Sequence, residues 1–241
     1  MAKPTYQEML DAGVHFGHMR KKWNPKMSPY IFMERKGIHI IDLNRTSESL
    51  EKAANAMRAV AKSGRKILFV ATKKQGRDIV AEAAKSVGMP YVTDRWLGGM
   101  LTNFSTIKRS VKKMQTIDRM LADPTATSIT KKERLTLSRE RAKLEKVLGG
   151  IANLMRLPGA IFIVDIHHEH IAVAEARRLG IRTFAMVDTN SDPNLVDYPI
   201  PANDDASKSI AIITEYMTEA IKEGLEERSK TKAEKASATA E

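Results

Sequence analysis

The sequence predicts an α/β protein built on a doubly wound parallel sheet, with an antiparallel pair of helices inserted into it. Short, continuously apolar segments alternate with amphipathic ones on both sides of the chain's centre, which is typical of strands buried on both faces and separated by helices. Between these two parts, residues 104–151 show only helical periodicity. A chain of 241 residues is long enough for one such domain and an insertion.

The first part of the α/β domain spans residues 1–103. Its opening Thr5-Tyr6-Gln7-Glu8 is a capping box for a short helix that ends near Ala12. Glycine, tryptophan and proline punctuate residues 13–30, which predicts an extended loop. The strands predicted next are residues 38–41, 66–71 and 91–93, and the helices between them are residues 46–62 and 75–87.

The second part of the α/β domain spans residues 152–223. We predict strands at residues 160–165, 183–187 and 198–200, and helices at residues 168–179 and 204–223. The remaining residues 224–241 are mostly Ala, Ser, Lys and Glu without an apolar period. This composition predicts a frayed helix that passes into a flexible, disordered tail.

Residues 104–151 form the insertion, predicted to be a coiled-coil arm. Asp123-Pro124 ends its first helix, and Thr130-Lys131-Lys132-Glu133 is a capping box for its second. The apolar stripes are Phe104, Ile107, Val111, Met114, Ile117 and Leu121 on the first helix, and Leu137, Leu144, Leu148 and Ile151 on the second. Because two helices bury little surface by themselves, we expect this arm to project from the domain and dock on a partner.

Positive charge is concentrated in two segments. The chain has a net charge of +11, with a surplus of 4 in residues 1–40 and of 7 in residues 104–150, and the rest of the chain is neutral. Such a distribution favours a polyanionic partner, above all nucleic acid, because bound phosphates release counterions. The alternative is a charged surface that only maintains solubility.

Several classes of protein are excluded or disfavoured. The absence of cysteine excludes disulfides, thiol catalysis and a cysteine-ligated zinc site, and suits a reducing compartment. No apolar run approaches the roughly 20 residues of a membrane helix, and no signal peptide opens the chain. We therefore expect a soluble, cytoplasmic protein without a membrane partner.

Cations beside aromatic residues predict contacts with RNA, since cations hold phosphates and aromatic planes stack on unpaired bases. Alternatively, Trp23 or Trp96 is a core residue that has a cation beside it only by chance. We expect one of the two tryptophans to be such a core residue. The turn at Thr72–Gln75 suits a phosphate, preferably one of an RNA backbone. The predicted RNA-binding residues are Arg20, Lys21, Lys22, Trp23 and Lys26 in the N-terminal loop, Lys73, Lys74, Arg95 and Trp96 in the domain, and Lys108, Arg109, Lys112, Lys113, Lys131, Lys132 and Arg134 on the arm.

Acidic residues and histidines offer a candidate metal site. Asp188 follows a predicted strand and Asp204-Asp205 precede the last helix, and loops at the ends of parallel strands converge, so these carboxylates could meet His18 around one cation. The alternative is a local structural role, with Asp204 or Asp205 as the N-cap of the last helix and with Asp188 and Asn190 shaping the turn before Pro193. The cluster His167, His168 and His170 lacks zinc-motif spacing, which favours core or RNA-stacking histidines.

Two further functions stay open on this reasoning. A phosphate-handling enzyme would use the Thr72–Gln75 turn and the carboxylates, although the chain has neither a P-loop nor a GxGxxG motif. A protein adaptor would bind other proteins and have negligible affinity for RNA.

Four segments resemble those of a known family: Gly13–His18 (GVHFGH), Trp23–Met27 (WNPKM), Arg95–Asn103 (RWLGGMLTN) and Val187–Pro193 (VDTNSDP). In this order they are similar to bacterial small-subunit ribosomal protein two, and the resemblance extends from about Tyr6 to Gly224.

This resemblance implies an α/β domain with a coiled-coil arm, bound to 16S rRNA near the head–body junction of the small ribosomal subunit. It also implies contacts with neighbouring ribosomal proteins, including the large mRNA-binding protein one, and no catalysis, small-molecule substrate or required cofactor. Relatives can hold a zinc ion near that contact, and the matching positions here are Asp188, Asp204 and Asp205, with His18 as our addition.

Overall fold

The computed structural model describes residues 3–122 and 130–238, so the predicted helix stop at Asp123-Pro124 lies outside the described residues. Its centre is a five-stranded parallel sheet in the order β5-β4-β6-β7-β8. The strands are β4 (Ile67–Val70), β5 (Tyr91–Val92), β6 (Ala160–Val164), β7 (Arg182–Val187) and β8 (Tyr198–Pro201). The predicted parallel α/β sheet is therefore confirmed.

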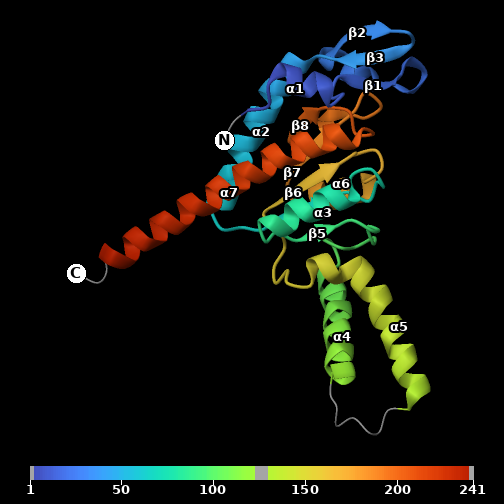
Figure 1. Cartoon of the computed structure of the whole chain (residues 1–241), viewed down its shortest axis with the longest axis vertical. Helices are drawn as coiled ribbons and strands as arrows, with labels where there is room; N and C mark the ends of the chain where they lie inside the picture. The colour runs from blue at the N-terminus through green and yellow to red at the C-terminus, as the bar shows by residue number, and fades with distance from the viewer. Residues whose placement is uncertain (1–2, 123–129, 239–241) are drawn as a thin grey trace.

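Helices cover both faces of this sheet (Figure 1). The buried strand residues fall alternately into two core layers, one against each face. One face, with Phe69, Phe162 and Phe184, packs on α2 (Leu43–Lys62), α3 (Arg77–Ser86) and α7 (Ser207–Ala238). The other, with Leu68 and Ile161, packs on α6 (His170–Arg178) and the base of the insertion. Each core strand contributes apolar residues to both layers, which explains its unbroken hydrophobicity.

A second, three-stranded antiparallel sheet precedes the central one and was not predicted. It has the order β1-β3-β2, with β1 (Phe16–Met19), β2 (Ile31–Arg35) and β3 (Ile38–Ile41). The prediction of a loop over residues 13–30 was thus wrong at β1. Between β1 and β2 the chain forms the short 3-10 helices η1 (Arg20–Lys22) and η2 (Pro25–Tyr30). The capping box at Thr5 is confirmed and opens α1 (Tyr6–Asp11).

The predicted and observed secondary structures differ over the longest segment at the end of the chain. The last helix, α7, does not end at Glu223 but continues to Ala238, so the predicted disordered tail is not confirmed. Arg58 and Lys62 of α2 form ion pairs with Glu227 of α7, between Arg58 Nε and Glu227 Oε1 at 3.8 Å and between Lys62 Nζ and Glu227 Oε2 at 3.0 Å. These contacts, together with the helix-forming residues Ala, Lys and Glu, support a helix that needs no apolar stripe at its end.

The insertion consists of α4 (Phe104–Ala122) and α5 (Lys131–Leu148), which run antiparallel and project from the domain (Figure 1). Lys113 of α4 pairs with Glu140 of α5, and Asp118 of α4 pairs with Arg141 of α5. The α4 stripe is confirmed, since Ile107, Val111, Met114 and Ile117 are all buried. Packing of the two helices as a coiled coil stays a prediction. After α5, the 3-10 helix η3 (Gly149–Ile151) returns the chain toward β6.

The close approach of α7 to α2 yields a first testable prediction. A Cβ added at Gly224 would lie 2.5 Å from the backbone oxygen of Arg58 and 2.9 Å from Ala61 Cβ. A Gly-to-Ala change inside a helix normally gains about 1 kcal/mol, but overpacking against backbone costs about 1–3 kcal/mol. We therefore expect Gly224→Ala to lower the free energy of unfolding in urea denaturation. Gly98→Ala, which adds its Cβ in open space, is the control, and a stabilised Gly224→Ala protein would contradict the packing described.

Candidate functional site

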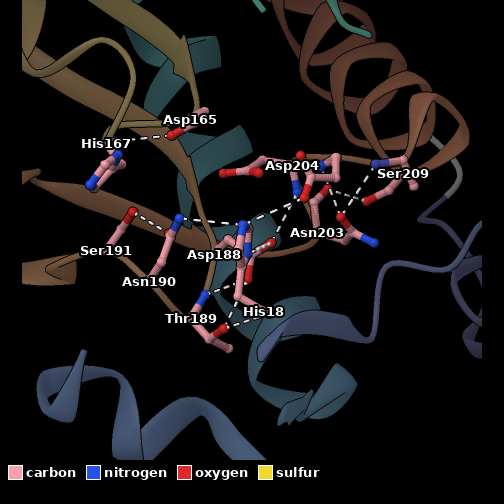
Figure 2. A network of polar contacts seen from close by, with 12 residues as sticks. His18, Asp165, His167, Asp188, Thr189, Asn190, Ser191, Asn203, Asp204 and Ser209 are labelled. Atoms are coloured by element: carbon pink, nitrogen blue, oxygen red, sulfur yellow. Dashed lines mark hydrogen bonds and ion pairs between the residues drawn. The ribbon is translucent and has the colours of Figure 1, made fainter. Parts of the chain in front are cut away.

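Charged residues from separate parts of the chain gather at the carboxyl edge of the parallel sheet (Figure 2). Asp165 directly follows β6, Asp188 directly follows β7, and Lys73 lies in the turn after β4. Asp204 and Asp205 lie between β8 and α7. The predicted convergence of Asp188 and Asp204 is confirmed, because parallel strands end at the same edge of the sheet.

Lys73 lies among three carboxylates. Its Nζ is 2.6 Å from Asp204 Oδ1, 2.6 Å from Asp205 Oδ1 and 3.2 Å from Asp165 Oδ2. Burial alone lowers the pKa of Lys73, but the charge and hydrogen bond of Asp204, with its neighbours, outweigh it and raise the pKa above its usual range. Lys73 therefore stays an ammonium ion committed to internal ion pairs, and its predicted contact with RNA was wrong.

Asp204 is the most enclosed member of this group. It is fully buried, and its Oδ2 has no hydrogen-bond partner among the described residues. Burial raises the pKa of Asp204 above its ordinary value, and the nearby Asp165 and Asp188 charges add to this effect, while Lys73 opposes it. Asp204 thus pairs through Oδ1 with Lys73 and keeps a second, buried oxygen without a hydrogen-bond partner among the described residues.

His18 joins the N-terminal sheet to this cluster. Its Nδ1 lies 3.1 Å from Asp188 Oδ2, and its Nε2 lies 3.5 Å from Asp205 Oδ2. The hydrogen bond that His18 donates to the Asp188 carboxylate raises the pKa of His18 despite the opposing effect of burial. The preceding Gly17 permits this approach, since a Cβ there would lie 2.6 Å from Thr189 Cγ2, and the His18 amide donates to Thr189 Oγ1 at 2.8 Å.

Ligand atoms of His18, Asp188 and Asp204 all lie within 4.8 Å of one another, the one such group in the part of the chain that the structure describes. One imidazole and two carboxylates, with an orphaned buried oxygen on Asp204, fit a small divalent cation such as zinc. Asp205 lies outside this group, although its Oδ2 is 3.5 Å from His18 Nε2 and its Oδ1 is paired with Lys73.

The capping alternative for Asp204 and Asp205 was wrong. The helix α7 begins at Ser207, two residues after Asp205. The turn before it is closed by Asn203, whose Oδ1 accepts hydrogen bonds from the amides of Asp205 at 2.8 Å and Ala206 at 3.3 Å.

A second buried carboxylate holds the segment around Trp96. Glu175 of α6 accepts hydrogen bonds from Trp96 Nε1 at 3.1 Å and from the backbone amides of Gly99 at 2.7 Å and Leu101 at 2.9 Å. Burial raises the pKa of Glu175, but these donors outweigh burial and lower it. Trp96 is 7% exposed, so it is the core tryptophan of the two, and its predicted stacking on RNA was wrong. The sequence offered no sign of this role for Glu175.

The Thr72–Gln75 turn does not form a phosphate site. Glu169 occupies it, because its Oε1 accepts from the Thr72 amide at 2.8 Å and from Thr72 Oγ1 at 2.5 Å. With Lys73 committed to carboxylates, only Lys74 of the two lysines is exposed. The geometry therefore speaks against the phosphate-handling enzyme.

The other predicted RNA-binding residues lie on the surface. Trp23 is 38% exposed and packs against His39 with ring centroids 5.1 Å apart. Five of the cations have internal partners: Arg20 with Glu34, Lys26 with Asp192, Lys113 with Glu140, Arg134 with the Leu121 carbonyl, and Lys108 with the Met155 carbonyl. Those exposed without a described ion pair are Lys21, Lys22, Lys74, Arg95, Lys108, Arg109, Lys112, Lys131 and Lys132. His167, His168 and His170 are also exposed, so the core interpretation of these histidines was wrong.

In comparisons with known proteins, the chain matches ribosomal proteins, a class of structural components that are not enzymes. The chain belongs to the family described as ribosomal protein S2, whose model matches residues 9–224.

Similar relatives bear the name small ribosomal subunit protein uS2. The relative from Cytophaga hutchinsonii is 60% identical over 95% of this chain and 91% of its own length. The relative from Parabacteroides distasonis is 58% identical over 100% of this chain and 85% of its own, and that from Flavobacterium psychrophilum is 61% identical over 95% and 86%. No helix within the described residues is long and apolar enough to cross a membrane.

The role of Lys73 generates a second prediction. Replacing Lys73 with Met removes the ammonium and leaves Asp204 and Asp165 facing each other without a counterion. We expect the free energy of unfolding, measured with urea at neutral pH, to fall by about 3–5 kcal/mol, as when one partner of a buried ion pair is removed. Lys74→Met, at the exposed neighbouring lysine, should change it by less than about 0.5 kcal/mol. Equal effects of the two changes would contradict a structural role for Lys73.

Proposed function

We propose that this chain is a structural constituent of the small ribosomal subunit and supports translation in the cytoplasm by binding 16S rRNA. The observation that carries the proposal is membership of the ribosomal protein S2 family, with relatives named as small-subunit proteins over nearly their full length. The N-terminal loop and the arm are the surfaces proposed to contact the RNA.

The geometry of the cations supports this assignment. Lys21 and Lys22 of η1 and Arg109 and Lys112 of α4 are exposed without a described ion pair. Trp23, beside the loop cations, leaves part of its ring open to solvent. Cations free to bind phosphate beside an accessible aromatic ring are what an RNA-binding surface requires.

An apolar surface on the N-terminal sheet supports contacts with neighbouring ribosomal proteins. Phe16, Phe32 and Met33 are 47%, 70% and 49% exposed, and Tyr6 beside them is 55% exposed. All four line a cavity of about 300 Å³. Exposed apolar patches of this kind mark protein-binding surfaces, and we assign this face to ribosomal protein partners, including the mRNA-binding protein one.

His18, Asp188 and Asp204 are proposed to hold a zinc ion, with Asp205 near the same position. The ion would link β1 to the carboxyl ends of β7 and β8, and so fasten the N-terminal sheet to the central one. Lys73, which is paired with Asp204 Oδ1, would keep its position beside the ion.

The third prediction tests assembly. Tagged protein from a lysate should sediment with the small subunit in a sucrose gradient and be released by high salt, because phosphate contacts weaken with ionic strength. A variant with Lys21, Lys22, Arg109 and Lys112 changed to Gln should be released at lower salt. The control variant changes Lys52, Arg177, Arg178 and Lys222 to Gln, which are exposed cations outside the loop and arm. Wild-type protein at the top of every gradient would contradict the proposal.

The fourth prediction tests the metal. Calorimetric titration of ZnCl₂ into the purified protein should show one site, weakened by His18→Ala or Asp188→Asn by more than the roughly 10–100-fold that loss of an outer-shell partner of a metal site costs. Affinity should be lower near pH 6 than near pH 7.5, because the hydrogen bond to Asp188 raises the pKa of His18 and a proton then competes with the metal. His167→Ala, at an exposed histidine outside the cluster, should bind as the wild type does. Unchanged affinity in His18→Ala and Asp188→Asn would mean that the ion binds elsewhere, and an equal loss in His167→Ala would show that the loss is not specific to this cluster.

A further inference from the structure

Cations also gather at the opposite, amino edge of the parallel sheet. Arg65 and Lys66 precede β4, Arg156 lies shortly before β6, and Arg182 opens β7. The register places Ile67, Ala160 and Arg182 side by side on these three neighbouring strands. Since adjacent strands lie about 4.8 Å apart, side chains from three distant segments of the chain meet at one edge.

These arginines are not neutralised within the described part of the chain. Arg65, Arg156 and Arg182 are exposed and have no carboxylate within 4.0 Å among the described residues. Lys66 donates to the Gly88 carbonyl at 2.7 Å, which leaves its charge uncompensated as well. The edge therefore presents a concentrated positive charge to solvent.

Three cavities connect this edge to the arm. A cavity of about 510 Å³ is lined by Arg65, Lys66 and Arg156, and a cavity of about 270 Å³ by Arg65 and Arg182. The larger one shares Leu154 and Met155 with a third cavity, of about 320 Å³, at the base of α4. That third cavity is lined by the cations Lys108, Arg109, Lys112 and Arg119. The cavity along the basic face of the arm thus adjoins the cavity at the amino edge of the sheet, and Leu154 and Met155 lie between their cations.

One of these arginines is held in position by a glycine. A Cβ on Gly159 would lie 2.6 Å from Arg65 Cβ and 2.6 Å from Arg65 Cδ, so the Arg65 stem passes directly over the Gly159 backbone. A guanidinium whose stem is packed in this way loses less conformational entropy when it binds a phosphate.

We propose that this surface, which we name the amino-edge track, binds the phosphate backbone of ribosomal RNA and extends the RNA contact of the arm across the sheet. The track is defined by Arg65, Lys66, Arg156 and Arg182. This inference rests on the proposed function. RNA is favoured over an acidic protein because the cavity at the track adjoins the cavity lined by the arm's cations, and because arginine forks match phosphate oxygens.

The test compares salt dependence of RNA binding. Full-length protein is titrated with 16S rRNA transcribed in vitro over a series of KCl concentrations. Each phosphate contact contributes about 0.7–0.9 to the slope of log affinity against log salt, so a variant with Arg65, Arg156 and Arg182 changed to Gln should lose about 2–3 from that slope. The matched control, Lys52, Lys208 and Lys222 changed to Gln, removes the same charge at exposed cations that line none of the three cavities, and it should keep the wild-type slope.

The outcomes separate the track from the function on which it rests. The inference about the track alone is overturned if the track variant keeps the wild-type slope while the wild-type protein binds RNA tightly and the variant of Lys21, Lys22, Arg109 and Lys112 does not. A wild-type protein without salt-dependent RNA binding overturns both. Thermal melting of each variant shows whether a loss comes from unfolding.

A second measurement distinguishes RNA from protein at the track. Because the chain has no cysteine, Leu157→Cys provides a single attachment point for a photo-crosslinker beside Arg156, at a side chain that is 43% exposed. The labelled protein is assembled into small subunits and irradiated. We expect a crosslink that ribonuclease removes, and none from Ile171→Cys near the start of α6, at the opposite, carboxyl edge of the sheet, where the wild-type side chain is 44% exposed. A crosslink resistant to ribonuclease and removed by protease would assign the surface to a protein and overturn the inference.

Discussion

The ion cluster around Lys73 determines how the rest of the molecule is arranged. The strand order puts β5 and β6 on opposite sides of β4, and in doubly wound sheets the crevice between the two central strands at this reversal is where ligands bind. Here the protein's own groups fill that crevice. Lys73 pairs with Asp165 across it, and Glu169 accepts from Thr72 beside it. A site that binds nucleotides in related architectures is used in this chain for internal stabilisation, which agrees with a structural component.

The same cluster fixes the N-terminal sheet to the central one. Asp188 contacts His18 of β1, and the neighbouring Asn203 donates from its amide Nδ2 to the Gly13 carbonyl at 3.1 Å. The Asn24 amide donates to the Thr189 carbonyl at 2.7 Å. These contacts determine where the basic loop that follows β1 lies. The charges buried in the sheet thus set the position of the charges proposed to face RNA.

Periodicity predicted most of the fold, because a strand buried on both faces and an amphipathic helix each have a distinct apolar pattern. It failed at β1, whose partner β3 is distant in sequence and whose Gly17 and His18 interrupt any alternation. It also failed at the end of α7, where helix propensity and ion pairs replace an apolar stripe. The convergence of His18, Asp188 and Asp204 could be predicted because topology alone brings strand ends together. The role of Lys73 could not be predicted, because the sequence does not show whether a lysine faces a phosphate or a carboxylate.

Counting charge along the chain did not identify the basic amino edge of the sheet, for a related reason. The two basic segments account for the whole net charge, yet Arg65, Arg156 and Arg182 lie outside them, in segments that are neutral on balance. No carboxylate lies within five residues of any of the three, and the acidic residues that balance their charge lie farther along the chain, as Asp165 and Asp188 do at the carboxyl edge. A parallel sheet then brings the same end of each strand to a common edge, so that charges from separate segments lie together there. What a polyanion encounters is therefore set by strand register and crossover connections, and a charged surface can form from segments whose composition shows no excess charge.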